Sequence, residues 1–253
     1  MIDNPSMHRL AQQLLAARHA RVTLGDIDIA LLPKNAAEAY QVQQLTLAAL
    51  GGAGAFKVGA KTPLEIPRYA PIPATKVWAT GQDIPYRDFS RVGLELEIAF
   101  RFKSELNASH AGLSDDEILD QIQEMMVAVE IVDSRYTKWP HVDKLAQLAD
   151  LQGNGALIVS DAVPYDPDFD FMSPSMSFAC GPQLIFSGNS SHTAGDPRRL
   201  LVWWVRKWIS EGQVVTPSSV VTTGSYTGIY SAPGPDDVVG EIAGIGRVAF
   251  SLV

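Results

Sequence analysis

Apolar residues alternate with other residues between positions 94 and 102 more regularly than elsewhere in the chain. The apolar positions that recur at every second residue are Leu94, Leu96, Ile98, Phe100 and Phe102. Successive side chains on a β-strand point to opposite faces of the sheet, so this spacing predicts a strand whose apolar face is buried. Glu95 and Glu97 would then point together from the other face of the same strand.

Helical spacing and capping signals predict two helices in the N-terminal part of the chain. Residues 8–20 place apolar side chains three and four positions apart, as on one face of a helix. A second helix is expected to begin at Asn35, with Glu38 three positions later as in a capping box. The pair Gly51–Gly52 should end this second helix.

A second capping box occurs near the middle of the chain. Ser114 is followed three positions later by Glu117, which predicts a helix over residues 115–126. The apolar segment over residues 127–134 should follow this helix as a strand.

Short strands, turns and one more helix are expected in the remaining segments. Proline and glycine interrupt the apolar residues between 56 and 88, which favours short strands joined by turns. Asp196–Pro197 predicts a helix start, Gly212 its end, and the alternation over residues 238–253 is typical of strands. Helices thus come first and strands mostly later, which predicts an α+β fold with a large, partly antiparallel β core.

The composition excludes several classes of function. The chain has 253 residues, of which 46% are hydrophobic, and its formal net charge is -8. This composition supports a large core but shows no concentrated positive field for nucleic-acid binding. No uncharged apolar run reaches the roughly 18 residues of a membrane span, and residues 1–13 hold no apolar signal core. We therefore expect a cytoplasmic protein without nucleic-acid or membrane partners; its single cysteine, Cys180, agrees with a reducing compartment.

The shared face of Glu95 and Glu97 is the first sign of chemistry. Residues two apart on a strand lie about 6.5–7 Å apart, so two flexible carboxylates can reach one ion between them. Hard divalent cations such as Mg²⁺ prefer oxygen ligands of this kind. A solvated strand face would show the same pattern, so the pair alone leaves both interpretations open.

Two further charged residues occur within apolar segments. Glu130 has apolar neighbours on both sides, and a buried carboxylate needs a partner, either a metal ion or Arg135. Lys57 lies in a similar segment and would need an anion, from the protein or from a substrate, unless its side chain reaches the surface. Both residues are candidates for a site, and their partners remain open at this point.

Six short motifs occur in a particular order along the chain. They are Ala39–Gln43, Phe56–Gly59, Leu94–Phe100, Glu130–Arg135, Thr223–Ser225 and Gly244–Val248. Together they resemble the 2-keto-4-pentenoate hydratase and 4-oxalocrotonate decarboxylase branch of the fumarylacetoacetate hydrolase superfamily. The resemblance covers nearly the whole chain, and its most specific part is the Glu-x-Glu pair followed later by Glu-x-x-Asp-Ser-Arg.

The resemblance implies a fold and a metal site. The fold would be a mixed β-sandwich roll, residues 55–253, preceded by an N-terminal helical part, residues 1–54. Glu95, Glu97 and Glu130 match the divalent-metal ligands of the superfamily, and Mg²⁺ or Mn²⁺ is the expected cofactor.

The resemblance also implies residues that contact the substrate. Lys57 matches the active-site lysine, which would bind substrate and take part in catalysis. Further substrate-binding candidates are Arg68, Arg135, Asn154 and Ser225. Arg68 stands where related hydratases often carry an aspartate proposed for proton transfer. Arginine is not a general base near neutral pH, but it can bind a second carboxylate on a substrate.

The activity implied by the resemblance is that of a hydratase, a lyase of aromatic-compound catabolism. It would add water to a small 2-hydroxy-2,4-dienoate or 2-keto-4-enoate, with the metal ion stabilising the enolate that develops. A 2-oxo-acid decarboxylase or a C–C hydrolase of the same superfamily would use the same stabilisation. A non-catalytic homologue that only binds such acids is a further alternative. Members of this branch usually form oligomers, so a homo-oligomer is expected.

Overall fold

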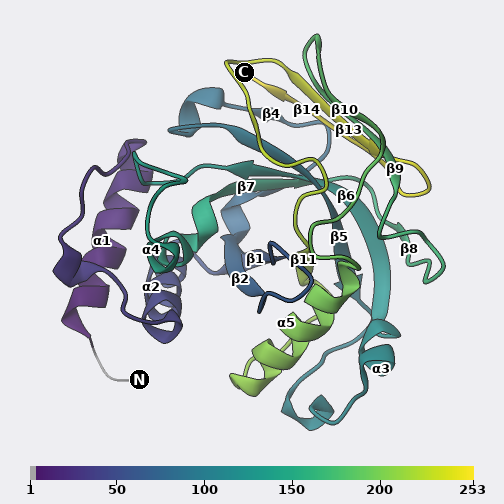
Figure 1. The fold of residues 1–253 in the computed structure, drawn as a ribbon, viewed down its shortest axis with the longest axis horizontal. Coiled ribbons are helices and arrows are strands. Elements are labelled where there is room, and N and C mark those ends of the chain that lie inside the picture. The colour runs from purple at the N-terminus through teal and green to yellow at the C-terminus, as the bar shows by residue number, and fades with distance from the viewer. Residues whose placement is uncertain (1–3) are drawn as a thin grey trace.

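The computed structural model of the protein describes residues 4–253. Residues 1–3, which begin both the expected N-terminal part and the segment 1–13, lie outside the described residues. The α-helices are α1 (Pro5–Ala20), α2 (Ala36–Ala49), α3 (Asp115–Leu119), α4 (Lys144–Ala149) and α5 (Arg198–Ser210). Short 3₁₀-helices are η1 (Ile29–Leu31), η2 (Ala74–Lys76), η3 (Tyr86–Asp88), η4 (Ala108–His110) and η5 (Leu151–Gly153). In Figure 1, α1, α2 and α4 lie together at one side of the molecule, and strands occupy its middle and upper parts.

The larger of the two sheets is mixed. Its strands are β1 (Ala53–Gly59), β2 (Arg68–Pro73), β3 (Val77–Ala79), β5 (Gly93–Phe102), β6 (Ile122–Val132), β7 (Asn154–Val159), β8 (Val163–Pro164), β11 (Val220–Thr222) and β12 (Tyr230–Ser231). The order across the sheet is β2-β1-β11-β5-β6-β7-β3, with β12 paired to β5 and β8 paired to β6. The pairs β1–β11 and β3–β7 are parallel, whereas the other pairs are antiparallel.

The smaller sheet packs against one face of the larger sheet. Its strands are β4 (Asp83–Ile84), β9 (Ser175–Cys180), β10 (Gln183–Asn189), β13 (Asp237–Ile242) and β14 (Gly246–Leu252). They lie in the order β10-β9-β13-β14-β4, and the β13 and β14 strands contact β6 of the larger sheet (Figure 1). Two mixed sheets with a few helices are the architecture expected of the α+β class, and the expected fold is confirmed.

The main core fills the space between the two sheets. The five apolar residues that alternate along β5 lie in this core, and none is more than 1% exposed. Phe178 and Val238 of the smaller sheet belong to the same core. Gly240 is needed for this close packing, because a Cβ atom there would lie 2.5 Å from the side chain of Leu96. The predicted strand and its buried face are therefore confirmed.

The helix predicted over residues 115–126 is wrong in its length. Ser114 and Glu117 form both hydrogen bonds of the capping box, yet α3 already ends at Leu119. The next residues belong to β6, which begins at Ile122 and pairs with β5 along its whole length. A capping box fixes where a helix begins, and pairing with a long neighbouring strand decides where this one ends.

Two other helix starts lie where capping predicts them. Asn35 accepts a hydrogen bond from the backbone N–H of Glu38, although the carboxylate of Glu38 accepts from the backbone N–H of Lys34 rather than from Asn35. At the start of α5, Asp196 accepts from the backbone N–H of Arg198. Side chains with short-range hydrogen bonds thus fix both starts, as sequence predicts.

The N-terminal helices pack with a helix from later in the chain. Helices α1, α2 and α4 surround an apolar cluster of their own, which includes Leu10 and Leu148. The packing of α4 with the N-terminal helices joins residues from both sides of the expected boundary at residue 54, and β1 begins just before it, at Ala53. The division of the chain into 1–54 and 55–253 therefore stays a proposal. Neither these helices nor any other described helix is long and apolar enough to span a membrane.

Candidate metal centre

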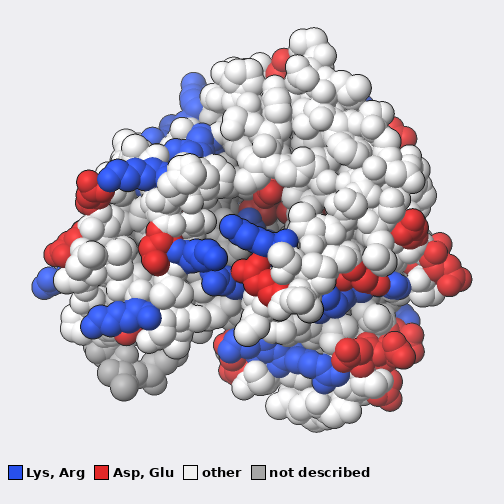
Figure 2. Space-filling view, in the orientation of Figure 1, with Lys and Arg blue, Asp and Glu red and all other residues white. Residues whose placement is uncertain are grey.

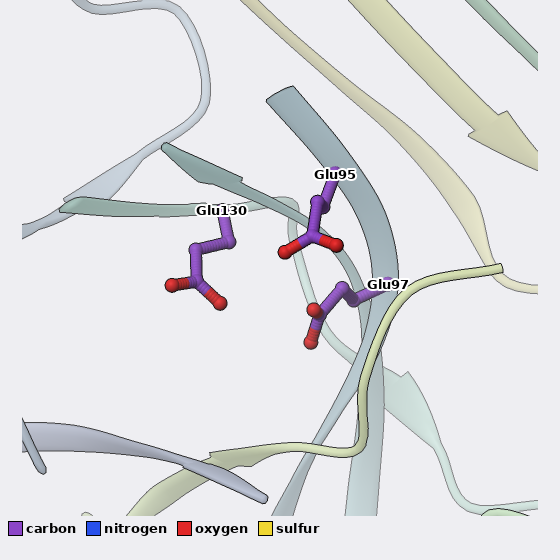
Figure 3. Close-up of side chains that lie close together, drawn as sticks. All are labelled: Glu95, Glu97 and Glu130. Carbon is purple, nitrogen blue, oxygen red and sulfur yellow. The ribbon is translucent and has the colours of Figure 1, made fainter. Parts of the chain in front are cut away.

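Three glutamates meet on the face of the larger sheet that lies opposite the main core. Glu95 and Glu97 are two residues apart on β5, and Glu130 of β6 lies directly across from Glu95 in the antiparallel pairing. One carboxylate oxygen from each residue lies within 4.8 Å of the other two. Figure 3 shows the three carboxylates extending from the two neighbouring strands into one space. The register of β5 and β6 thus assembles the three candidate ligands.

The carboxylates of this cluster have few hydrogen-bond partners. Lys57 Nζ donates to Oε1 of Glu130 across 2.5 Å, and Asn154 Nδ2 donates to the same oxygen across 3.3 Å. The backbone N–H of Gly224 donates to Oε2 of Glu97 across 3.1 Å. Glu130 is 0% exposed, and its Oε2 has no hydrogen-bond partner among the described residues. A divalent cation would satisfy this buried oxygen, so the all-oxygen cluster fits such an ion.

The charges of the cluster point to the same conclusion. Burial raises the pKa of Glu97 to about 8, and the negative charges of Glu130 and Glu95 add to this effect. Burial also raises the pKa of Glu95 to about 7, against the attraction of Lys57. Burial lowers the pKa of Lys57, but the three carboxylates outweigh this effect and the net shift is upward. One ammonium faces three carboxylates, so a divalent cation would bring the local charge to zero.

The raised pKa values predict how the metal-free protein responds to pH. Between the ordinary glutamate pKa of 4.5 and the folded values of about 7 and about 8, the folded carboxyls retain protons that the unfolded chain has released. The melting temperature in EDTA should therefore fall as pH rises from about 5 to about 8. Saturating Mn²⁺ should reduce this fall, because the ligands bind metal in their deprotonated form. Thermal melts with EDTA and with MnCl₂ measure both slopes, and equal slopes would contradict the metal site.

The cluster opens into a cavity of about 690 Å³, a volume typical of small-molecule sites. Glu95 and Glu97 line this cavity together with the basic side chains of Lys61, Arg68 and Lys144. Figure 2 shows a hollow near the centre of the visible face, where acidic and basic side chains lie close together. Apolar lining comes from Trp139, Pro140, Leu148, Tyr226 and Ile229. A cavity with metal-binding carboxylates, free cationic groups and apolar walls suits a small organic anion.

Comparisons with known proteins agree with this picture. No family model matches the chain. A curated 2-keto-4-pentenoate hydratase from Paraburkholderia phymatum is 21% identical over 263 residues, which cover 100% of this chain and 99% of the relative. The structure of 4-oxalocrotonate decarboxylase from Pseudomonas putida G7, complexed with magnesium and adipate, matches with a TM-score of 0.86 at 17% identity and covers 100% of this chain and 99% of that one. A fumarylacetoacetate hydrolase family protein from Yersinia pestis CO92 matches with a TM-score of 0.58 at 17% identity, over 79% of this chain and 91% of that one.

The chain is thus similar over its whole length to a 2-keto-4-pentenoate hydratase, and it shares its fold with 4-oxalocrotonate decarboxylase and a fumarylacetoacetate hydrolase family protein. The resemblance drawn from the six motifs is therefore confirmed, including the branch that joins 2-keto-4-pentenoate hydratases with 4-oxalocrotonate decarboxylases.

The remaining candidate residues lie at different distances from the cavity. Arg68, at the start of β2, and Ser225 both line it. Asn154 lies behind Glu130 and donates to it, and Asn154 is 0% exposed. These positions leave Arg68 and Ser225 available to a ligand, whereas Asn154 supports the carboxylate.

The structure does not bring Arg135 into the cavity, contrary to the expectation that it binds substrate. Its side chain is 1% exposed, and its Nε lies 2.5 Å from Oδ1 of Asp150. Its two terminal nitrogens donate to the backbone carbonyls of Asn154 and Asp150, each across 2.9 Å. The guanidinium of Arg135 therefore pairs with Asp150 and not with Glu130. Arg135 also donates to the backbone of Asn154, the residue whose side chain contacts Glu130.

Sequence patterns did not point to His192, which lines the cavity and is buried. Its Nδ1 accepts from the backbone N–H of Ala194, and its Nε2 lies 3.2 Å from the carbonyl of Gly224. The N–H of Gly224 in turn contacts Glu97. Two loops that are distant in sequence meet here, so the spacing of residues along the chain could not have identified this histidine.

Proposed function

We propose that the chain is a metal-dependent hydro-lyase that adds water to a 2-hydroxy-2,4-dienoate or 2-keto-4-enoate. The observation that carries the proposal is the meeting of three carboxylates and one lysine beside a cavity that also presents basic side chains. The similarity to a 2-keto-4-pentenoate hydratase over the whole chain supports this activity. Mg²⁺ or Mn²⁺ is the proposed cofactor, because the three side chains offer only oxygen ligands.

Each residue of the cluster has a proposed task. A divalent cation held by Glu95, Glu97 and Glu130 would supply a Lewis acid for the carboxylate and the 2-oxygen of the substrate. The N–H of Gly224 keeps the carboxylate of Glu97 oriented toward the cluster. Lys57, whose ammonium lies beside Glu130, can bind a substrate oxygen and transfer a proton to or from the developing enol.

Arg68 is proposed to bind a second carboxylate at the far end of the substrate. Arg68→Gln is expected to raise KM about tenfold to a hundredfold for a 2-hydroxydienoate that carries a distal carboxylate, since a hydrogen bond to a charged group is lost. Little change in KM is expected for a 2-hydroxydienoate without this group. Steady-state kinetics with both substrates measure the difference, with Arg101→Gln, outside the cavity and paired with Glu124, as the control. An equal change for both substrates would exclude the proposed contact.

The decisive experiment for the reaction follows the ultraviolet absorbance of a 2-hydroxydienoate incubated with the protein and Mg²⁺ or Mn²⁺. Loss of the dienol chromophore, with a product heavier by one water molecule, is the expected result. The same incubation without metal and in EDTA should leave the chromophore unchanged. Binding of the acid without any conversion would replace the hydratase by a non-catalytic homologue.

A decarboxylase is the second candidate, because 4-oxalocrotonate decarboxylase matches the whole chain with a TM-score of 0.86. Release of CO₂ from a 2-oxo acid with a distal carboxylate would identify this activity. Two shorter products in the mass spectrum would instead identify a C–C hydrolase. The three reactions therefore differ in product mass, and one set of incubations separates them.

A further inference from the structure

A second cavity, of about 270 Å³, lies beside the C-terminal end of α1. Its lining includes Arg18 and Arg21 from that end of the helix, Lys76 from η2, and the acidic residues Asp88 and Asp133. We term it the basic cavity. Within residues 4–253, no residue lines both the basic cavity and the larger one. The basic cavity is therefore a separate site from the glutamate cluster.

The two acidic residues of the basic cavity already have partners. Asp88 forms an ion pair with Arg21 across 2.8 Å. Asp133 accepts two backbone N–H groups at one carboxylate oxygen, each across 3.1 Å. Its other carboxylate oxygen lies 3.8 Å from Nη1 of Arg135. Both acids attract Lys76 from a distance, but neither forms an ion pair with it in the described part of the chain, so the N–H donors of Lys76 are not used by a carboxylate there.

The side chains of Lys76 and Arg18 directly contact aromatic rings and a backbone carbonyl, while nearby acidic residues act on them only from a distance. Lys76 Nζ lies 5.2 Å and 5.4 Å from the ring centroids of Trp78 and Phe89. These contacts stabilise an ammonium but use none of its N–H donors. Arg18 donates to the backbone carbonyl of Asn154 across 2.6 Å, which fixes its guanidinium. Burial lowers the pKa of Arg18 to about 9 and also lowers that of Lys76, so both cations gain from an added anion.

The dipole of α1 does not by itself explain why three cationic side chains gather around the basic cavity. Basic side chains are favoured at a helix C-terminus, which would account for Arg18 and Arg21. The same effect does not account for Lys76, because η2 brings this residue to the cavity from another part of the chain. The chain as a whole has a formal net charge of -8. Cationic side chains outnumber acidic ones in the lining of the basic cavity, against the net negative charge of the whole chain.

We propose that the basic cavity binds a small oxyanion, such as phosphate or a carboxylate, between Lys76 and Arg18. Cavities of about 300–1,000 Å³ hold drug-sized ligands, so the smaller basic cavity suits a small ion. The two side chains are already ordered by Trp78, Phe89 and the carbonyl of Asn154, which reduces the entropy lost on binding. The proposal is independent of the reaction proposed for the larger cavity.

Titration calorimetry with sodium phosphate and, separately, with sodium acetate tests the proposal on the full-length, metal-free protein at constant ionic strength. We expect one phosphate or acetate per chain to bind saturably. Lys76→Met keeps the packing against both rings and removes the charge, and it should weaken binding about tenfold or more. Lys34→Met makes the same change of charge at the other end of α2, away from Leu50 of the cavity, and should leave binding unchanged.

Two further variants keep the experiment decisive. Arg68→Gln tests whether the measured anion binds in the larger cavity instead, because Arg68 lines that cavity. This variant should bind phosphate and acetate with the affinity of the unmodified protein. Arg21→Gln changes a side chain that is 51% exposed, and it should also weaken binding of the anion. It serves as the test if Lys76→Met lacks a native circular dichroism spectrum. The proposal is overturned if neither anion binds saturably. It is also overturned if Arg68→Gln or Lys34→Met weakens binding as much as the variants of the basic cavity.

Discussion

Replacing Glu97 with glutamine is expected to weaken Mn²⁺ binding by more than about 100-fold while leaving the fold intact. Glu97 is 1% exposed, and its carboxylate is one of the three that meet between β5 and β6. Changes just outside the ligands of a metal already weaken binding by about 10–100-fold, and the loss of a charged ligand should exceed this. The amide oxygen of glutamine can still accept from the N–H of Gly224, so the local structure should persist.

Glu97 is a better test than Glu130, because Glu130→Gln would also break the ion pair with Lys57. The matched control is Glu124→Gln, which removes the same charge from β6 at a residue that pairs with Arg101 outside the cluster. Calorimetric titration with MnCl₂ measures both variants. In EDTA, Glu97→Gln should also melt at a higher temperature than the unmodified protein, because it removes one of three neighbouring carboxylates, two of which are buried. Unchanged Mn²⁺ affinity in Glu97→Gln would refute the metal centre.

The alternation along β5 could be predicted because it depends on local geometry alone. A period of two places Leu96 and Glu97 on opposite faces whatever the neighbouring strands are. The contact between Glu95 and Glu130 has a different origin, since it depends on the register of β5 against β6. The number of residues between Glu95 and Glu130 does not reveal how β5 and β6 are aligned. The family resemblance supplied Glu130 as the third ligand, and the paired strands explain how it reaches the other two.

The structure differs from the sequence-based expectations where long-range contacts decide the outcome. The helix signal at Ser114 was real, but β6 takes over at Ile122 because β5 offers a partner along its whole length. Arg135 was one of the substrate-binding candidates that followed from the family resemblance. In the structure its charge is met by Asp150, which lies in the turn after α4. Burial of a charged residue can thus be predicted from its apolar neighbours, whereas its partner depends on the tertiary fold.

Lys57→Met is expected to reduce turnover by about 100-fold to 10,000-fold, the usual contribution of a group that transfers a proton. The variant should still bind Mn²⁺, because Lys57 is a neighbour of the cluster and offers it no oxygen ligand. Removing one partner of a buried ion pair costs roughly 3–5 kcal/mol, so the metal-free variant should be much less stable than the unmodified protein. Its melting temperature should then rise further on addition of Mn²⁺, since the added ion replaces the missing positive charge.

Three measurements separate this role of Lys57 from a purely structural one. Turnover is measured with saturating Mn²⁺, where the stability of the variant is restored, so a low rate there cannot result from unfolding. Lys57→Arg keeps the positive charge beside Glu130 but is not expected to exchange a proton near neutral pH, so it should recover stability and little of the rate. Lys34→Met, outside both cavities, should match the unmodified protein in rate and in stability. Full activity of Lys57→Met with bound metal would exclude proton transfer by this lysine and leave it only the task of balancing the charge of Glu130.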